Sequence, residues 1–420
     1  MPPLNEKFSD AKNIDKIAML SIHSSPAGEL GTRDTGGMSV YIRELAKEFG
    51  YLGILVDVFT LSQTQSSPSI ISLFNNVRLI NLNVKSDQLI FKENLFDYLP
   101  AVLQAFNQTV KKESLRYDLI HSHYWLSGIL GNQIKQIQGI PHVTTFHTMG
   151  AVKNRACLQE SEPDFRIKQE KELAAACDRI IASTRNEAHE LISLYHAKNE
   201  KIGVVPAGVN LELFQPMNQS AARRKLGLHG KEQLLLYVGR YVPVKGLDRL
   251  LKIMPHINNA KQDQHRFKLL VIGGDDENEQ LPSVIRGLNI EKAVALLGRK
   301  DQALLPAYYS AADMLVVPSY HESFCLAGLE SLACGTPVVT APVGGLPEII
   351  NPTNGYVLEE PADKAMAAAI IKVADSQRQG RFNPNQIRAS VLDYSWKNTA
   401  KLMLAEYQKV TKGNRFENQG

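Results

Sequence analysis

The sequence has few cysteines and no long hydrophobic run, and each absence excludes a class of protein. Its 420 residues hold four cysteines, and no two of them have C-x-x-C spacing: Cys157, Cys177, Cys325 and Cys334. Neither a disulfide scaffold nor a zinc site is expected. No stretch reaches about 18 consecutive apolar residues, and Met1–Asp15 is polar, so we expect neither a membrane span nor a signal peptide. We therefore expect free thiols and a cytoplasmic location.

Charge of one sign is also scarce. The 47 Lys and Arg residues nearly balance the 43 Asp and Glu residues, and the net charge is +4. No run of about five or six like charges occurs, so no nucleic-acid-binding tail is expected. A mildly basic chain suits an enzyme of anionic small molecules, and it is equally compatible with weak peripheral contact with a membrane. The length predicts two or three domains.

Short apolar, β-branched runs form two series along the chain. Helical periodicity separates many of them, as in Val40–Phe49 and Leu99–Lys112. This alternation predicts an α/β protein with two Rossmann-like, doubly wound parallel-sheet domains facing a cleft. The first series consists of Lys16–Ile22, Ile54–Leu61, Val77–Val84, Tyr117–Ile120, His142–Phe146, Arg179–Ser183 and Ile202–Val205. The second consists of Gln233–Val238, Phe267–Ile272, Ala293–Leu297, Met314–Val317 and Pro337–Thr340.

The segment Pro206–Pro216 predicts the connection between the domains, because two prolines and a glycine interrupt it. We expect an N-terminal domain over residues 1–210 and a C-terminal domain over residues 211–394. A final helix over residues 395–412 would pack back on the first domain. Ligands of open parallel sheets bind beyond the carboxyl ends of the strands, so functional residues should follow strands.

A glycine-rich segment follows the first expected strand. Ser21–Met38 contains four glycines, and Gly36-Gly37 stands where a helix should begin. The free N–H groups of that helix start could bind a phosphate. The spacing matches neither G-x-G-x-x-G nor the P-loop, which disfavours a nicotinamide dehydrogenase or a kinase. An ordinary strand-to-helix turn is the alternative.

Two cations follow the expected strand Gln233–Val238. Arg240 and Lys245 lie five positions apart in the segment after it. Arginine can bind a diphosphate through two N–H groups, and lysine adds a point charge. The alternative is a pair of surface cations.

Two glutamates follow the expected strand Met314–Val317. Glu322 falls in the loop, and Glu330 falls about one turn into the next helix. The pair could bind the hydroxyl groups of an elongated ligand, and the N–H groups of Phe324, Cys325 and Leu326 at the helix start could reach a phosphate or sugar. Two glutamates on a solvated helix face are the alternative.

Together these motifs resemble the large retaining glycosyltransferase family 4 (group 1), which has the two-domain GT-B fold and a Glu-x7-Glu signature. The resemblance runs from about Ile17 to Gln408. Further matching stretches are Val238–Arg240, Leu305–Asp313, Val317–Ser319, Ala333–Val339 and Val343–Ile349.

The resemblance implies roles on the donor side. Arg240 and Lys245 would bind the diphosphate of a nucleotide-sugar donor, expected to be a UDP-sugar, and stabilise the charge of the leaving nucleotide. Glu330 would bind the ribose and Glu322 the transferred sugar. The backbone of Gly37 would contact the diphosphate from the other domain, Arg299 would lie at the base, and the N–H groups of Phe324, Cys325 and Leu326 would complete the site.

The resemblance also implies a reaction that needs no cofactor. No residue stands out as a covalent nucleophile, so the departing diphosphate would take the acceptor proton on the front face of the sugar. No metal is expected, and no Asp-x-Asp motif is present to bind one. The family usually has glycine where this chain has Cys325; the backbone contact is retained if φ is negative there.

The N-terminal half resembles one subgroup. It comprises the mycothiol-pathway transferases, which move N-acetylglucosamine from UDP to inositol 3-phosphate, and the related sucrose-phosphate synthases, which use fructose 6-phosphate. The matching stretches are Thr35–Ile42, His121–Gly128, Phe146–Thr148, Val152–Asn154 and Glu187–Leu194. This resemblance implies a phosphorylated sugar or cyclitol acceptor.

The acceptor phosphate would be bound by Lys92, Tyr124, Thr148 and Arg166, with Ser39 nearby. His147 would lie near the transferred sugar as a fourth catalytic residue, beside Arg240, Lys245 and Glu322. The alternatives without a functional role are a core position for Tyr124, a solvated face for Lys92 and a structural role for His147. A structural role is also what we expect for His23 and His123.

We therefore expect a retaining transferase of glucose or N-acetylglucosamine that acts on small molecules. A homodimer is one option, since the resembling family includes dimers. Three alternatives stay open: a nucleotide-sugar epimerase of the same fold, a glycosyltransferase with a non-phosphorylated or lipid acceptor, and a non-catalytic binding relative. The first would convert the donor with no acceptor present.

Overall fold

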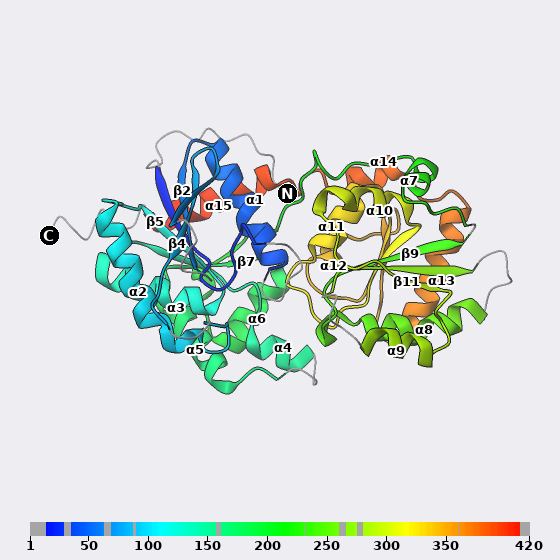
Figure 1. The fold of residues 1–420 in the computed structure, drawn as a ribbon, viewed down its shortest axis with the longest axis horizontal. Coiled ribbons are helices and arrows are strands. Elements are labelled where there is room, and N and C mark those ends of the chain that lie inside the picture. Colours follow the sequence, from blue (N-terminus) through cyan, green and yellow to red (C-terminus); the bar gives the residue numbers. More distant parts are fainter. Residues whose placement is uncertain are drawn as a thin grey trace.

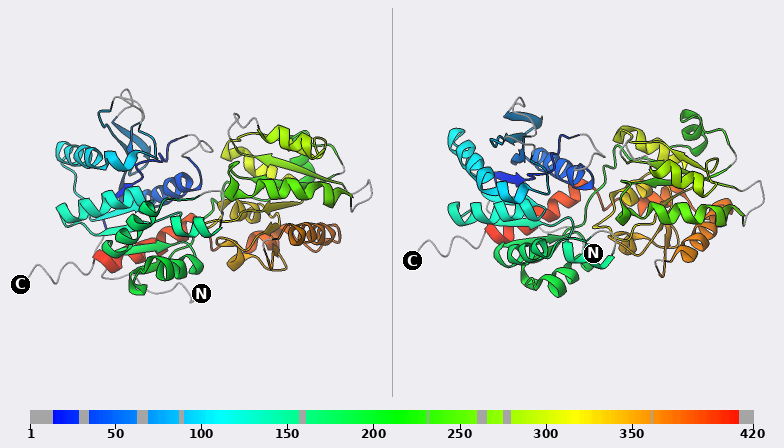
Figure 2. Two further views of the ribbon diagram at one scale, coloured as in Figure 1. Left: turned by 90° about the horizontal axis from the view of Figure 1, so that it is seen from below. Right: turned by 60° about the horizontal axis from the view of Figure 1, so that its bottom comes forward.

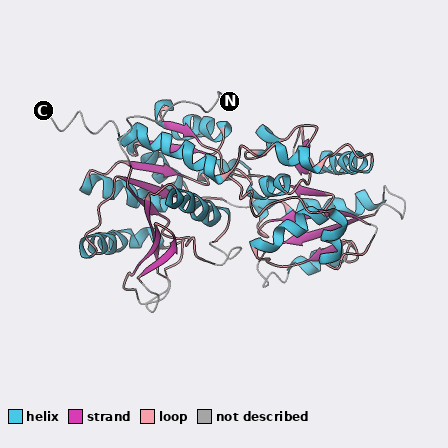
Figure 3. Cartoon of the chain, turned by 90° about the horizontal axis from the view of Figure 1, so that it is seen from above, coloured by secondary structure: helices cyan, strands magenta, loops and turns pink. Residues whose placement is uncertain are grey.

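The chain folds into two α/β lobes that lie side by side (Figure 1). The computed structural model describes residues 14–28, 35–62, 69–86, 90–156, 161–230, 232–259, 266–274, 280–360 and 362–411. Each lobe has a twisted sheet with helices on both faces, which is plain in the view from above (Figure 3). The predicted fold class is confirmed.

The sheet of the first lobe has the order β3-β4-β2-β1-β5-β6-β7-β8. Its strands are parallel except for the antiparallel pair β3–β4. Their bounds are β1 (Lys16–Leu20), β2 (Leu55–Leu61), β3 (Ile70–Phe74), β4 (Val77–Leu82), β5 (Leu119–His123), β6 (His142–Thr145), β7 (Arg179–Ala182) and β8 (Ile202–Val204).

Both faces of this sheet are buried at its central strand β1. Successive residues of β1 point to opposite faces, and both sets pack in apolar clusters. Ile17 and Met19 pack in the cluster that holds α1 and α15, while Ala18 and Leu20 pack in the cluster that holds α2 and α3. The helices of this lobe are α1 (Gly37–Tyr51), α2 (Leu95–Lys112), α3 (Trp125–Gln138), α4 (Gly150–Ala156), α5 (Asp164–Ala176), α6 (Arg185–Tyr195) and the 3-10 turn η1 (Asn199–Lys201).

The sheet of the second lobe is parallel throughout, in the order β11-β10-β9-β12-β13-β14. Leu234 and Leu236 of β9 pack in the cluster that holds α10 and α11, and Leu235 and Tyr237 pack with α8 and α13. Its strands are β9 (Gln233–Val238), β10 (Phe267–Ile272), β11 (Val294–Leu296), β12 (Met314–Val317), β13 (Val338–Thr340) and β14 (Gly355–Val357).

The helices of the second lobe precede and follow these strands in turn. They are α7 (Gln219–Lys225), η2 (Pro243–Lys245), α8 (Leu247–Asn259), α9 (Gln280–Gly287), η4 (Gln302–Leu304), α10 (Leu305–Ala311), α11 (Leu326–Ala333), α12 (Leu346–Ile349), α13 (Asp363–Arg378) and α14 (Pro384–Ala389). Among the described residues, no helix is both long and apolar enough to cross a membrane.

The strand orders reverse once in each sheet. The chain leaves β1 towards one edge and returns to pair β5 on its other side; in the second sheet it leaves β9 and returns at β12. Such reversals open a crevice at the carboxyl ends of the two central strands, where ligands of this architecture bind. The ends of β1, β5, β9 and β12 are therefore the places to look for a site.

The last helix, α15 (Trp396–Thr411), returns to the first lobe (Figure 2). A bridge between Val209 and Ser395 brings the two crossing segments together. Tyr407 Oη lies 2.6 Å from His121 Nδ1, and Arg179 pairs with Glu406. Where one domain ends and the next begins, at 210/211 and 394/395, stays a prediction.

Two short strands were absent from the sequence prediction. Both β3 and β14 lie at sheet edges. The residues of β3 are all partly or fully exposed, so they lack the clean apolar pattern that buried strands show. Cys177, Cys325 and Cys334 are free thiols, as predicted, and Cys157 lies outside the described residues.

We expect Met403→Ala to destabilise the first lobe, because the fully buried side chain anchors α15. Removing a buried methionine costs about 2–5 kcal/mol of the free energy of unfolding. Urea unfolding followed by tryptophan fluorescence measures this loss, since Trp125 and Trp396 lie on α3 and α15. The exposed Lys401→Ala on the same helix should change it by less than about 0.5 kcal/mol. Equal effects of the two variants would show that α15 is not anchored there.

Candidate active site

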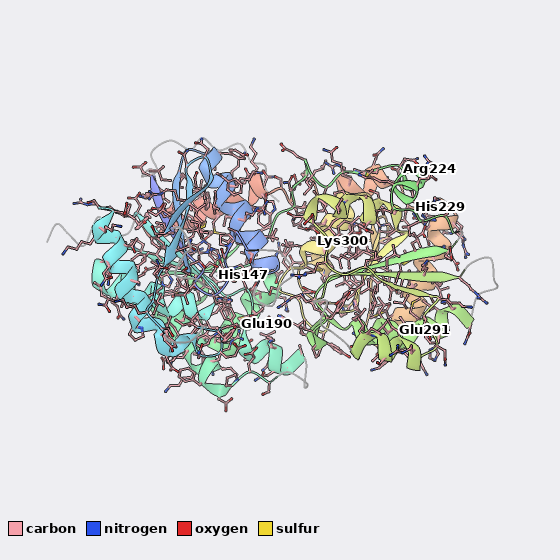
Figure 4. All side chains as sticks on the ribbon, viewed as in Figure 1. His147, Glu190, Arg224, His229, Glu291 and Lys300 are labelled. Atoms are coloured by element: carbon pink, nitrogen blue, oxygen red, sulfur yellow. The ribbon has the colours of Figure 1, made fainter. Side chains whose placement is uncertain are left out.

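One cavity of about 510 Å³ lies between the carboxyl ends of the two sheets. Residues of both lobes line it, and its size is typical of a small-molecule site. Labelled His147 and Lys300, which both line it, lie on opposite sides of the gap between the lobes (Figure 4). Fourteen of the fifteen predicted site residues line this cavity: Gly37, Lys92, Tyr124, His147, Thr148, Arg166, Arg240, Lys245, Arg299, Glu322, Phe324, Cys325, Leu326 and Glu330.

The cation–glutamate pair at the centre of the second lobe is fixed before any ligand arrives. Lys245 Nζ donates to Glu322 Oε2 at 2.7 Å, and Ser319 Oγ donates to Glu322 Oε1 at 2.7 Å. Lys245 ends η2, and the next residue, Gly246, has φ +66. A Cβ atom at Gly246 would lie 2.3 Å from Pro318 O, so only glycine lets this turn approach the loop after β12.

Arg240 follows β9 at the rim of the cavity and is exposed. Its carbonyl accepts a hydrogen bond from Tyr237 Oη at 2.9 Å, which fixes the backbone after the strand. Arg299 follows β11 and lines the same side. The second lobe thus presents four cationic side chains, Arg240, Lys245, Arg299 and Lys300, to one cavity, an arrangement suited to an anionic ligand.

Glu330 lies in the second turn of α11 and is only 8 % exposed. Burial raises its pKa from 4.5 to about 7, although hydrogen bonds from Tyr309 and Gln302 oppose the shift. Tyr309 Oη donates to Glu330 Oε2 at 2.7 Å. A buried carboxylate can bind the hydroxyl groups of a ligand, and Tyr309 and Gln302 hold it in place for that task.

Cys325 departs from the conformation that the sequence analysis allowed. Its φ is +83, in the left-handed region, and not negative. Glycine adopts this conformation freely, whereas a residue with a Cβ is strained there. The position therefore suits glycine, and the cysteine is retained at a cost, buried between the cavity and the apolar core.

The start of α1 faces the second lobe across the cavity. Its N-cap residue, Gly36, offers no side-chain hydrogen bond, which leaves the first N–H groups of the helix for a ligand. A Cβ atom at Gly37 would lie 3.9 Å from Leu326 Cδ1, so the two lobes approach closely here.

Four predicted acceptor residues meet at the other end of the cavity. The ring of Tyr124 contacts two cations, with Lys92 Nζ and Arg166 Cζ each 4.9 Å from its centroid. Arg166 also donates to Thr148 Oγ1 at 3.2 Å and to Thr148 O at 3.0 Å. Tyr124 packs in the core, which was the alternative to a binding role, but it also lines the cavity.

Ion pairs fix the guanidinium of Arg166. Its Nε lies 2.7 Å from Glu170 Oε1, and its Nη1 lies 2.8 Å from Glu162 Oε2. Lys153, which also lines the cavity, pairs with Glu162. The cluster thus holds hydroxyl and N–H donors in fixed positions before any ligand binds. Such a site could bind a phosphate group.

Ser39 is the one predicted site residue that the structure does not bring to the cavity. It is fully buried on α1, and its Oγ lies 2.7 Å from Ser24 Oγ. The short side chain reaches this neighbour instead of the open space, so the structure gives its predicted contact with an acceptor no support.

His147 lines the cavity from the first lobe and contacts the second lobe. Its φ is +59, and its carbonyl accepts a hydrogen bond from Ser323 of the other lobe. Burial lowers the pKa of His147 to about 3, so the imidazole is neutral at neutral pH. Its Nε2 lies 2.9 Å from His123 Nδ1.

Several cavity residues were missed by the sequence analysis, and His23 was expected to have only a structural role. His23, Ser319, His321 and Gln302 line the cavity, and His23 packs 4.5 Å from the ring of Tyr124. Burial, with the nearby charge of Lys92, lowers the pKa of His23 to about 3. Its place directly after the first strand was a signal that could have identified it. Within the described ranges, no three His, Cys, Asp or Glu side chains group so as to hold a metal ion.

The fold and the cavity are those of a GT-B glycosyltransferase, and the comparisons agree. The model of the family described as Glycosyltransferase Family 4 matches residues 35–213, and that of Glycosyl transferases group 1 matches residues 218–388. The chain belongs to this family and is a glycosyltransferase.

Named relatives cover almost the whole chain. A D-inositol 3-phosphate glycosyltransferase of Thermobispora bispora is 36 % identical over 411 residues, which are 95 % of this chain and 96 % of that protein. The enzyme of the same name from Kribbella flavida is 35 % identical over 415 residues, covering 94 % and 96 % of the two chains.

Solved structures share the fold. A sucrose-phosphate synthase from Thermosynechococcus elongatus has a TM-score of 0.86 and 31 % identity, covering 95 % of this chain and all of that one. Anabaena HepE in complex with UDP and glucose has a TM-score of 0.73 and 17 % identity, covering 94 % of this chain and all of that one, which shows the fold alone.

We expect Glu330→Gln to stabilise the protein at alkaline pH. The pKa of about 7 exceeds the value of 4.5, so the folded state holds the proton more tightly than the unfolded chain does. The glutamate therefore costs stability that grows as pH rises from about 4.5 to 7. At about 1.4 kcal/mol per pH unit, the cost is of the order of 3 kcal/mol above pH 7.

Thermal melts of both proteins at pH 5 and pH 8 measure this difference. The variant should melt above the wild type at pH 8 and close to it at pH 5. The exposed Glu291→Gln serves as control and should show no such pH dependence. A wild type that is the more stable at pH 8 would contradict the assigned burial cost.

Proposed function

We propose that this glycosyltransferase moves glucose or N-acetylglucosamine from a UDP-sugar to a phosphorylated cyclitol or sugar, with retention at the anomeric carbon. The observation that carries the proposal is the cavity, to which each lobe contributes its own charged cluster. The second lobe contributes cations and glutamates, and the first contributes the Lys92–Tyr124–Arg166 cluster. The names of the relatives, an inositol-phosphate transferase and a sucrose-phosphate synthase, agree with an acceptor of this class.

The two lobes would divide the substrates between them. Residues 1–210, with the helix over 395–412, would form the acceptor domain, and residues 211–394 would form the donor domain. The contacts of α15 with the first lobe support this division.

On the donor side, Arg240 and Lys245 would hold the diphosphate, and the α1 start at Gly37 would approach it from the other lobe. Glu330 would accept hydrogen bonds from the ribose, with its second oxygen held by Tyr309. Glu322 would bind hydroxyl groups of the sugar. Its oxygens already accept from Lys245 and Ser319, so the carboxylate is oriented before binding.

Further donor contacts would come from backbone and base-side groups. The N–H groups of Phe324, Cys325 and Leu326 lie at the start of α11, and Arg299 lies on the side where the base would bind. The Cys325 thiol and Cβ occupy space that glycine would leave open, so this residue would affect which sugar fits.

The reaction would proceed on one face of the sugar. The bond from the anomeric carbon to the diphosphate oxygen breaks, and a bond to the acceptor hydroxyl forms on the same face. The acceptor proton passes to the departing diphosphate, whose negative charge Arg240 and Lys245 stabilise. His147, between the two subsites, would orient the transferred sugar.

On the acceptor side, Lys92, Arg166 and the hydroxyls of Tyr124 and Thr148 would bind the phosphate. A UDP-sugar epimerase of the same fold would not need this second cluster, so the cluster favours transfer. An NMR time course with UDP-sugar alone separates the two: a transferase leaves the configuration of the donor sugar unchanged without acceptor.

The family uses nucleotide-sugar donors. We further propose that the reaction needs no additional cofactor and no metal, and that it takes place in the cytoplasm. We also propose that the enzyme forms a homodimer or contacts a membrane only peripherally.

We expect Arg240→Ala and Lys245→Ala to lower kcat roughly 100-fold or more, because each removes a group that stabilises the leaving diphosphate. Steady-state kinetics with UDP-sugar and a phosphorylated acceptor measure the loss. The exposed Arg224→Ala on α7 is a control of equal charge change and should keep wild-type turnover. Wild-type kcat in both cavity variants would refute the assigned role.

We expect Lys92→Ala to raise the KM for a phosphorylated acceptor roughly 10-fold, while the affinity for UDP stays unchanged. Acceptor titrations and calorimetry with UDP measure the two quantities. Lys111→Ala, an exposed lysine on α2, is the control. An unchanged KM, or an equal loss of UDP affinity, would show that Lys92 does not bind the acceptor phosphate.

A further inference from the structure

A series of histidine rings leads from the cavity into the first lobe. His147 lines the cavity, and its Nε2 lies 2.9 Å from Nδ1 of His123, the last residue of β5. The ring of His123 lies 4.1 Å from that of His121. His121 is held at both nitrogens, 2.6 Å from Tyr407 Oη and 2.9 Å from Thr145 Oγ1.

The ring of His147 has little freedom to turn. Tyr41 meets it edge-on, with centroids 5.0 Å apart and planes at 81°. The backbone is held in the left-handed region at φ +59, and Ser323 donates to the carbonyl. His123 is fully buried behind it. The 2.9 Å contact between the two imidazoles is therefore a fixed feature of the cavity wall.

Both rings of this pair are neutral at neutral pH. Burial lowers the pKa of His147 to about 3. Burial lowers the pKa of His123 well below its usual value, and repulsion from His121 and His147 in their protonated forms adds to this shift. Each neutral imidazole carries one N–H, and one hydrogen bond joins the two, so only two arrangements of protons are compatible with it.

The second nitrogen of His123 distinguishes these arrangements. His123 Nε2 is buried and has no hydrogen-bond partner among the described residues. If His147 were the donor, His123 would carry its proton on Nε2, as a buried N–H with no acceptor. If His123 donates from Nδ1, only a lone pair is left unmatched. Orphaned buried N–H groups are the rarer defect, so His123 is the donor.

We propose that His123 is a positioning residue that fixes His147 in the tautomer with its proton on Nδ1. His147 Nε2 is then the acceptor of the pair, and Nδ1 has no partner within the described part of the chain. Because His147 lines the cavity, the reaction site is given an N–H donor there in place of a lone pair. His123, which lies behind His147, thus decides which substrate atoms His147 can bind. These are oxygens that accept a hydrogen bond.

The tautomer follows from the hydrogen bond and the unpartnered His123 Nε2, whereas its kinetic consequence rests on the proposed function. The direct test is 15N NMR of the full chain at pH 7 with labelled histidine, in which two-bond and three-bond proton correlations identify the protonated ring nitrogen. The chain has 11 histidines, and loss of signals in His147→Gln assigns the relevant ring. We expect the proton of His147 on Nδ1. A proton on Nε2, or a mixture of both forms, overturns the proposal.

Two variants test whether His123 is the cause. His123→Asn keeps an amide N–H near the position of Nδ1 and should preserve the tautomer of His147. His123→Leu removes the donor and should give a mixture. With donor and acceptor, His123→Leu should lower kcat roughly 3- to 10-fold, the value of one hydrogen bond, at unchanged affinity for UDP-glucose. His123→Asn should recover most of the loss.

His142→Asn is the matched control, because this buried histidine of β6 bonds Ser122 and Asn132 instead of His147. It should leave the tautomer of His147 unchanged. An unchanged tautomer in His123→Leu overturns the proposal even if kcat falls. Should that variant not fold, the wild-type and His123→Asn spectra still decide. A correct tautomer in an enzyme that transfers no sugar would contradict the proposed function and not this inference.

Discussion

The structure depends on one constraint: parallel strands all end at the same edge of a sheet. Two such sheets face each other by those edges, so residues that follow strands converge on one cavity. Tyr124 comes directly after β5, His147 two residues after β6, and Arg240 two residues after β9. The sharp turns that this requires strain the backbone. Tyr124, His147 and Cys325 all line the cavity with positive φ, a strain that the surrounding packing must hold.

Electrostatic groups in the cavity are held by neighbours before a substrate binds. Lys245 and Glu322 orient each other, and two glutamates fix Arg166. Glu330 is the extreme case. Its burial raises its pKa to about 7, so ionisation of this carboxyl lowers the free energy of unfolding. Because these groups are already in position, they need not reorient during the reaction. Fixed charges of this kind stabilise a developing charge most effectively.

Sequence patterns predicted what depends on local order and failed where distant contacts decide. Apolar runs located the buried strands, and residues after them, such as Arg240 and Glu322, lie in the cavity as expected. Edge strand β3 had no such pattern. The hydroxyl of Ser39 turned to Ser24, a tertiary contact that no motif encodes. The pairs Tyr309–Glu330 and His123–His147 join residues more than twenty positions apart, so only the fold reveals them.

The central claim is that one cavity joins a nucleotide-sugar to a phosphorylated acceptor. The most direct measurement is mass spectrometry of the products of UDP-glucose or UDP-N-acetylglucosamine incubated with inositol 3-phosphate, fructose 6-phosphate and their unphosphorylated forms. We expect a glycosylated product and stoichiometric UDP with at least one phosphorylated acceptor, and little or none with its unphosphorylated form. Equal or faster transfer to the unphosphorylated acceptors, or conversion of the donor sugar without any acceptor, would contradict it.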